Sequence, residues 1–191
     1  MKKVTFYIDG QNFFHALDSC IRKYNLDIKP QVNWLTLAKT FLRQQDNEVL
    51  TAINYFSAFY TPNIEIYRQQ QRYVSQLQQV GVNIILGKYK FKEKYCPICR
   101  KTHKGYEEKE TDINIALKFF ADAVDNIFDR AVLVSADTDL VPLIKIIKNR
   151  FPNKSISLAI PPQRDKYSKE LIQNVDNAKM ITLKRIRPHI F

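Results

Sequence analysis

Residues 131–140 of this chain read AVLVSADTDL, and this stretch decides the fold class. Its first four residues are apolar, which is typical of a buried β-strand. Two carboxylates follow, Asp137 and Asp139, separated by one residue. A buried strand usually leads into a Gly or Pro turn, so this pair of like charges calls for another explanation. The pair either caps the next helix or binds a cation.

Strand patterns alternate with helix patterns along the whole chain. Strands are predicted at 4–9, 49–60, 82–86, 131–136, 155–160 and 180–183. Helices are predicted at 12–24, 33–43, 63–80, 112–125, 140–150 and 166–174, with Asn33 and Asn63 as caps. Such alternation predicts a mostly parallel sheet with helices on both faces. We therefore expect one α/β domain over residues 1–191, a three-layer Rossmann-like fold with strand order 3-2-1-4-5.

The predicted helix at 112–125 has apolar residues at helical spacing. The face expected to point into the core consists of Ile113, Ala116, Leu117, Phe120, Ala121 and Val124.

Four aspartates are predicted to lie at one edge of this sheet. Asp9 ends the first strand, and Asp137 and Asp139 follow the fourth. Asp112 begins the helix that leads into the fourth strand, and such a helix starts at the carboxyl edge. Ligands of open α/β sheets bind at this edge, where the strand order reverses.

Carboxylates crowded into one cleft repel each other, and the pKa of each rises unless a cation neutralises them. Mg²⁺ and Mn²⁺ suit such oxygen ligands, and Asn12 and Ser135 beside the aspartates complete a suitable setting. One or two ions of this kind would activate a water and stabilise the leaving oxygen of a phosphodiester. The alternative for each aspartate alone is a helix cap. Four of them at one edge favour the metal site.

Three ordered stretches carry a resemblance to a known family. FYIDGQNFF at 6–14, KETDINIALKFFADAV at 109–124 and DRAVLVSADTDLVPLIK at 129–145 resemble a NYN domain of the LabA-like branch of the PIN-like nuclease superfamily. The resemblance covers about residues 1–160 and implies a Rossmann-like sheet with a metal-dependent ribonuclease site. Position by position, the implied metal ligands are Asp9, Asp112, Asp137 and Asp139, and the residues that orient ligands, water or phosphate are Asn12 and Ser135.

Two other folds that use paired aspartates fit less well. A TOPRIM domain would have Glu at the place of Asp9. A haloacid-dehalogenase phosphatase needs a nucleophilic DxD in its first strand, which YIDGQN lacks.

A Lys-rich insert at about 88–110 is predicted to form a hairpin. In a strand, Lys88, Lys90, Lys92 and Lys94 would share one face, opposite Tyr89, Phe91 and Tyr95. The lysines would then follow phosphates while the aromatic rings stack on bases. The alternative is an edge hairpin protected by its lysines, with the rings packed inward. Further candidate substrate contacts are Arg68, Arg72, Arg164, Lys166 and Lys169.

Cys96 and Cys99 form a CxxC that is followed by His103, which resembles half of a zinc-binding knuckle. Tetrahedral Zn²⁺ takes four ligands and no second CxxC exists, so a structural zinc and a pair of reduced, unligated thiols both remain open.

Composition limits the partners and the compartment. The formal charge of +11 favours anionic partners, nucleic acid above all. Three cysteines, an odd number, argue against a disulfide scaffold and for a reduced cytosolic setting. No apolar run approaches the ~20 residues of a membrane span, and MKKVTFYIDG enters a strand pattern instead of a signal peptide.

The leading hypothesis is a cytoplasmic Mg²⁺- or Mn²⁺-dependent ribonuclease, with a homodimer as an open option. The alternative is a non-catalytic RNA-binding or regulatory module that keeps the acidic pocket. A phosphatase acting on small phosphate esters is a third, weaker hypothesis.

Overall fold

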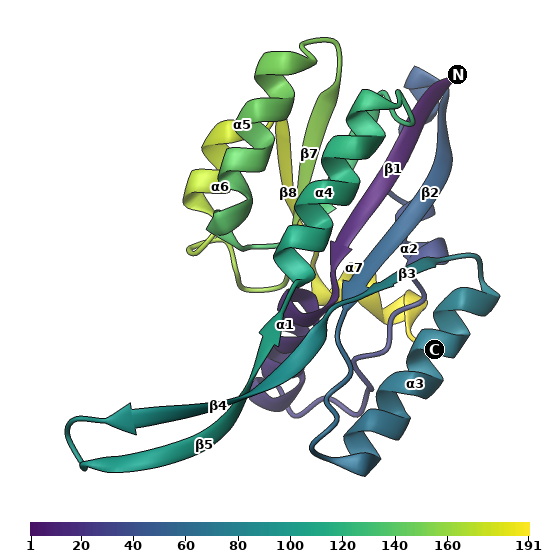
Figure 1. Ribbon diagram of the computed structural model, residues 1–191. Coiled ribbons are helices and arrows are strands. Elements are labelled where there is room, and N and C mark those ends of the chain that lie inside the picture. Colours follow the sequence, from purple (N-terminus) through teal and green to yellow (C-terminus); the bar gives the residue numbers. More distant parts are fainter.

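Six parallel strands form the central sheet of the computed structural model, which describes residues 1–191. The order is β3-β2-β1-β6-β7-β8, and helices cover both faces (Figure 1). The strands are β1 (Lys2–Asp9), β2 (Glu48–Ser57), β3 (Asn83–Leu86), β6 (Arg130–Val134), β7 (Ser155–Ile160) and β8 (Asn177–Met180). The helices are α1 (Gly10–Lys23), α2 (Trp34–Lys39), α3 (Ile64–Gln79), α4 (Thr111–Val124), α5 (Val141–Arg150), α6 (Lys169–Asn174) and α7 (Leu183–Ile186). The predicted order 3-2-1-4-5 is confirmed, and β8 adds a sixth strand.

Side chains alternate along β1 between two apolar cores, one on each face of the sheet. Phe6 and Ile8 pack with residues of α1, α2, α3 and α7. Tyr7 points to the other face and packs with residues of α4, α5 and α6. The sheet is therefore buried on both faces, as a parallel sheet requires.

Two expectations about individual elements are wrong. The last strand is at 177–180 because residues 183–186 form α7. Helix α4 buries Ile115, Phe119 and Ala123, while Ile113 is 62% and Leu117 65% exposed. The caps at Asn33 and Asn63 are confirmed, since each side chain accepts a backbone N–H of its helix.

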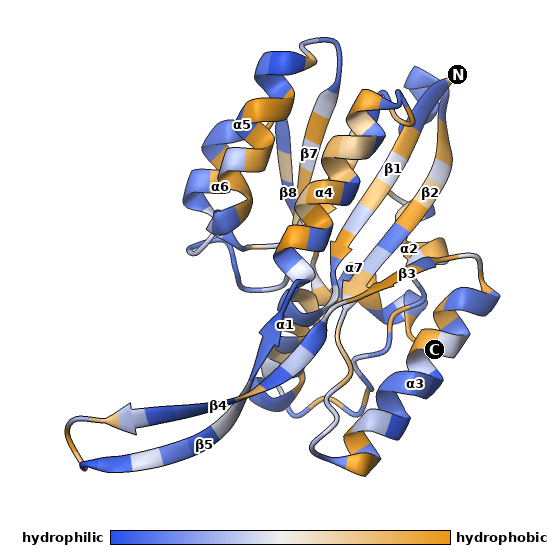
Figure 2. Cartoon of the chain, in the orientation of Figure 1, coloured by the Kyte–Doolittle hydropathy of each residue, from blue (hydrophilic) through white to orange (hydrophobic).

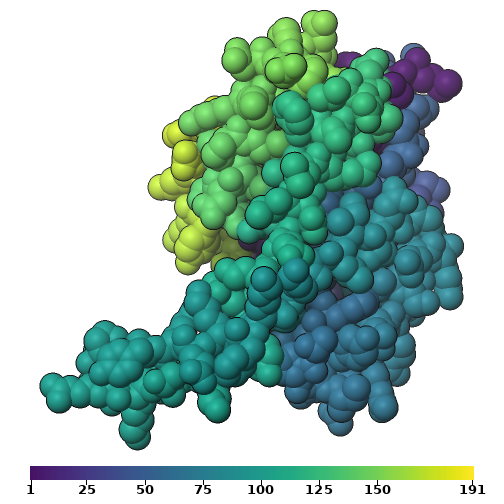
Figure 3. Space-filling model, in the orientation of Figure 1, coloured from purple at the N-terminus to yellow at the C-terminus, as the bar shows by residue number.

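The insert forms an antiparallel hairpin of β4 (Lys88–Cys96) and β5 (Lys101–Lys109). Its strands pair only with each other, and the hairpin stands away from the body of the molecule (Figures 1 and 3). Most of its length is hydrophilic (Figure 2). Only its base, where β5 leads into α4, adjoins the carboxyl edge of the sheet.

A buried ion pair joins β2 and β6 at the opposite, amino edge of the sheet. Arg130 Nε donates to Glu48 Oε1 over 2.7 Å, and Arg130 Nη2 donates to Glu48 Oε2 over 2.6 Å. The guanidinium also donates to Ser157 Oγ and to the carbonyl of Phe41, so its hydrogen-bonding capacity is largely used.

No helix has both the length and the apolar character that crossing a bilayer would take.

Candidate metal centre at the carboxyl edge

Asp9 is the buried anchor of the carboxyl edge, at the end of β1. Its Oδ1 accepts the backbone N–H of Asn12 over 3.0 Å and caps α1, and its Oδ2 accepts from Ser135 Oγ over 2.8 Å. The next residue must be small, because a Cβ on Gly10 would lie 2.5 Å from Tyr55 Cζ. The start of α1 is therefore pressed against β2, and the carboxylate of Asp9 is held in one position.

Asp137 follows β6 and begins a short 3-10 turn at Thr138–Leu140. Its Oδ1 accepts the backbone N–H of Asp139 over 3.0 Å. Ser135 lies between Asp9 and Asp137 and connects them. Its Oγ donates to the carboxylate of Asp9 and accepts the backbone N–H of Asp137. The serine of the VSAD stretch therefore helps to fix the positions of both aspartates.

Asp112 completes a group of three carboxylates from the first turn of α4. One ligand oxygen each from Asp9, Asp112 and Asp137 lies within 4.8 Å of the others. Asp139 does not belong to this group, although its negative charge also acts on Asp112. Three of the four predicted aspartates therefore come together, while the backbone N–H of the fourth supports Asp137.

The three carboxylates line a polar cleft of about 180 Å³ without any apolar side chain. Glu108 and Thr111 also line it, at the point where the hairpin meets α4. Thr111 Oγ1 donates to Glu108 Oε1 over 2.5 Å. The sequence analysis missed Glu108, which enters the site only through the register of the hairpin.

The electrostatics of the cleft disfavour several negative charges without a counterion. Burial raises the pKa of Asp9 to about 7 against the hydrogen bonds from Asn12 and Ser135, and repulsion by Asp112 and Glu108 adds to the rise. Burial, followed by the charges of Asp137 and Asp139, raises the pKa of Asp112. The donors are all oxygens and the site is short of positive charge, so it fits a hard divalent cation.

A sequence model of the NYN domain matches residues 3–183, and these residues include all three carboxylates. The chain belongs to the NYN domain family. NYN domains have a PIN-like nuclease fold, and the family generally consists of nucleases.

Two individual proteins are similar to this NYN chain. A protein of Pseudomonas putida, described as a 6-hydroxy-3-succinoylpyridine 3-monooxygenase, is 26% identical over 172 residues, covering 74% of this chain and 54% of that protein. The chain thus spans about half the length of this curated relative, whose name describes a monooxygenase and not a nuclease. A crystal structure of a protein of unknown function from Vibrio parahaemolyticus has a TM-score of 0.66 at 20% identity, covering 100% of this chain and 96% of that one. It shows the same fold.

The predicted basic contacts lie outside the cleft of the NYN chain. Arg68 and Arg72 are exposed on α3, and Lys166 is exposed in the loop after β7, where Arg164 is half-buried. Lys88, Lys90 and Lys92 are exposed on the hairpin. The one basic residue that lines the cleft is Lys109, at the end of β5.

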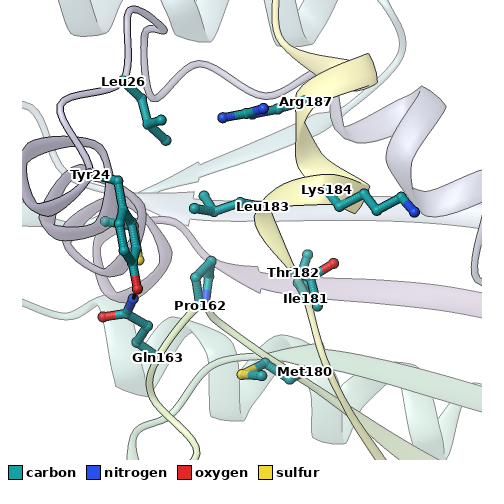
Figure 4. A pocket seen from close by; sticks show the side chains of 11 residues that line it. Tyr24, Leu26, Pro162, Gln163, Met180, Ile181, Thr182, Leu183, Lys184 and Arg187 are labelled. Atoms are coloured by element: carbon teal, nitrogen blue, oxygen red, sulfur yellow. Dashed lines mark hydrogen bonds between the residues drawn. The ribbon is translucent and has the colours of Figure 1, made fainter.

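A second, mostly apolar cavity of about 510 Å³ lies between the end of α1 and the segment that leads from β8 into α7 (Figure 4). Gln163 Nε2 donates to Tyr24 Oη over 2.8 Å at its side. It shares no lining residue with the acidic cleft, so its size does not make it the site of the carboxylate chemistry.

Proposed function

We propose that this NYN domain is a metal-dependent ribonuclease that hydrolyses phosphodiester bonds in RNA. The observation that carries the proposal is the convergence of Asp9, Asp112 and Asp137, three carboxylates from three separate elements, within 4.8 Å. Membership of a family that generally consists of nucleases supports it.

Asp9, Asp112 and Asp137 would hold Mg²⁺ or Mn²⁺ between them. When bound, such a cation supplies a Lewis acid that lowers the pKa of water and offsets the negative charge of the phosphate. Asp9 needs no rearrangement for this role, because Asn12 and Ser135 already fix both of its oxygens. The Oδ1 of Asn12 accepts the N–H of Ala136, which leaves its Nδ2 to donate to a phosphate oxygen.

The acidic cleft itself repels a polyanion, so RNA needs attractive contacts elsewhere. The hairpin offers them, and the aromatic side of β4 and β5 is not packed inward: Phe91 is 52%, Tyr106 46% and Tyr95 63% exposed. Tyr89 alone of the β4 rings is half-buried, against Tyr60, so the exposure of the other rings favours a contact surface over an edge hairpin with its rings packed inward. Exposed rings in a strand of this kind suit the stacking of unpaired bases.

These rings form a continuous path toward the cleft. Phe91 contacts Tyr106 with ring centroids 5.6 Å apart, and Tyr60 contacts both Tyr89 and Tyr106. Tyr89 is paired across the hairpin with Glu108, which lines the cleft. Bases stacked on these rings would place the attached phosphates near the carboxylates.

The lysines of β4 occupy the opposite face of the hairpin. Lys88 forms an ion pair with Glu110 and Lys92 one with Glu107, while Lys90 has no ion-pair partner. Together with the net charge of +11, this face would attract the phosphate backbone over a longer range.

The test is cleavage of single-stranded and structured RNA in the presence of Mn²⁺ or Mg²⁺. We expect cleavage that EDTA abolishes and added Mn²⁺ restores. Asp137→Asn should lower the rate by about 100-fold or more, because it removes a ligand charge from the site. Asp27→Asn is the matched control, since Asp27 is an exposed aspartate outside the cleft, and it should cleave like the wild type.

The alternative function is an RNA-binding or regulatory module without catalysis, which the exposed aromatic face of the hairpin would also serve. RNA binding with no cleavage under either metal would favour this module over the enzyme. Hydrolysis of a chromogenic phosphate monoester, with RNA left intact, would point to the phosphatase instead.

A cytoplasmic location is also part of the proposal. All three cysteines are free thiols, which suits a cytoplasmic location.

We also propose that residues 1–191 form one domain, because the sheet and both cores use elements from the whole length of the chain. The exposed apolar residues of α4 make a homodimer a reasonable assembly to test.

A further inference from the structure

Two cysteines and a histidine meet at the far end of the hairpin. The ligand atoms of Cys96, Cys99 and His103 lie within 4.8 Å of one another, and Cys99 Sγ is 3.2 Å from His103 Nε2. This cluster is far from the acidic cleft along the strands and has no part in the chemistry proposed there.

The hairpin register brings these side chains together. His103 is paired with Lys94 and Cys96 with Lys101, so Cys96 and His103 are on the same face of the two strands. The turn between the strands contains Cys99, and Arg100 adopts a left-handed backbone conformation with φ 52°. The turn therefore folds Cys99 back over the pair.

The tip has no apolar core that could explain the arrangement. Ile98 is 92% exposed, and Cys99 and His103 are exposed as well. Beyond the contacts of Tyr60 with Tyr89 and Tyr106, the two strands have only each other, and an isolated two-stranded hairpin is marginally stable in water. Small segments of this kind are commonly held by a bound metal or a disulfide.

We propose that Cys96, Cys99 and His103 bind a zinc ion that holds the tip of the hairpin in place. Two thiolates and an imidazole are soft to intermediate donors that select Zn²⁺ over Mg²⁺ or Mn²⁺. No other Cys, His, Asp or Glu joins the group, so the fourth ligand is a water at the exposed side. The proposal does not rest on the ribonuclease function.

The test uses the full chain, purified under reducing conditions without added metal. We expect close to one zinc per chain by elemental analysis. After removal of zinc and addition of Co²⁺, a thiolate-to-cobalt charge-transfer band should appear in the near ultraviolet. Cys99→Ser and His103→Ala should each weaken Co²⁺ affinity by more than about tenfold.

Cys20→Ser is the matched control, because Cys20 is a buried thiol in α1 and belongs to no metal group. It should keep both the zinc and the cobalt band. The proposal is overturned if reduced wild-type protein neither retains zinc nor develops the band. A band that persists undiminished in Cys99→Ser would overturn it equally, because the metal would then be bound elsewhere.

Hydrogen exchange provides a second readout that a nonspecific metal would not reproduce. Zinc should slow the exchange of amides in β4 and β5 and leave those of β1 and β6 unchanged. Equal exchange of the hairpin amides with and without zinc would contradict the structural role.

Discussion

Asp9 combines two roles that oppose each other. As the cap of α1 it accepts a backbone N–H, and as a member of the acidic group it lies buried beside other carboxylates. Burial raises its pKa to about 7, whereas an unfolded chain leaves it at 3.8. Between these two values the folded state holds a proton that the unfolded state has lost. Folding stability in the absence of metal must therefore fall as the pH rises from about 4 to about 7.

Asp9→Asn tests this balance. Asparagine keeps a cap oxygen and removes the buried charge, so in the presence of a chelator the variant should be more stable than the wild type at pH 8. We expect a gain on the order of 5 °C in unfolding temperature, or about 2 kcal/mol for a chain of this size, and little difference near pH 4. Thermal unfolding at both pH values measures it.

The same variant separates the apo protein from the metal-bound one. Mn²⁺ at pH 8 should raise the unfolding temperature of the wild type and leave that of Asp9→Asn unchanged, since the variant has lost a ligand. A variant less stable than the wild type at pH 8 with chelator would contradict the assigned cost of burying this carboxylate.

The residues of the acidic group differ in how far they can be predicted. Asp9, Asp112 and Asp137 stand at strand ends or helix starts, so the alternation of elements was enough to place them at one edge. Glu108 lies within a polar insert, and nothing local marks it. It reaches the cleft because β5 ends beside α4, which is a property of the hairpin register.

At the scale of elements, α4 shows why a correct helix can be given the wrong face. Apolar residues occur around most of its circumference, so helical spacing alone does not single out one side. The buried side includes a charged residue, Asp122, whose Oδ2 accepts from Tyr7 Oη over 2.8 Å. A charged residue is normally predicted to be exposed, so the sequence pattern assigns the wrong face of α4 to the core. The face that contacts β1 is the one that contains Asp122.

The exposed aromatic rings of the hairpin are expected to bind RNA. Phe91→Ala and Tyr106→Ala should each weaken binding of single-stranded RNA by about 1–3 kcal/mol, because each removes an exposed ring on which a base can stack. Fluorescence anisotropy with a short labelled RNA, in EDTA to prevent cleavage, measures the affinity.

The control for these variants is Tyr24→Ala, which removes an exposed ring at the end of α1, outside the hairpin. It should bind RNA like the wild type. If all three variants bind equally well, the aromatic face of the hairpin is not a contact surface for RNA.

At the scale of the whole molecule, the strand order was predictable because alternating elements permit few topologies. The buried pair of Arg130 and Glu48 was not, since the two residues are 82 positions apart and neither belongs to a motif. Burial acts to raise the pKa of Glu48, but the hydrogen bonds and charges of Arg130 and Arg43 outweigh it and lower that pKa. The pair therefore stabilises the fold at neutral pH, and its contribution is lost as the pH falls through the lowered pKa.

Glu48→Gln should reduce the free energy of unfolding by about 3 kcal/mol, because it leaves the buried guanidinium of Arg130 without its counter-charge. Urea unfolding at pH 7 measures the loss. Asp18→Asn breaks an ion pair between a half-buried Asp18 and an exposed Arg22 and should cost less than about 1 kcal/mol. If the two variants lose similar free energies of unfolding, the buried pair contributes no more to stability than the pair at the surface of α1.

The position of that ion pair has a consequence for how the chain can vary over generations. Arg130 begins β6 and the acidic cleft lies beyond its other end, so the two sites are on the order of 13 Å apart along the strand. Changes this far apart, with no shared partner, act almost independently on stability. Mutations can therefore alter or erase the aspartates while the amino edge keeps the sheet assembled. Such a scaffold lets a lineage explore new chemistry without first losing its fold.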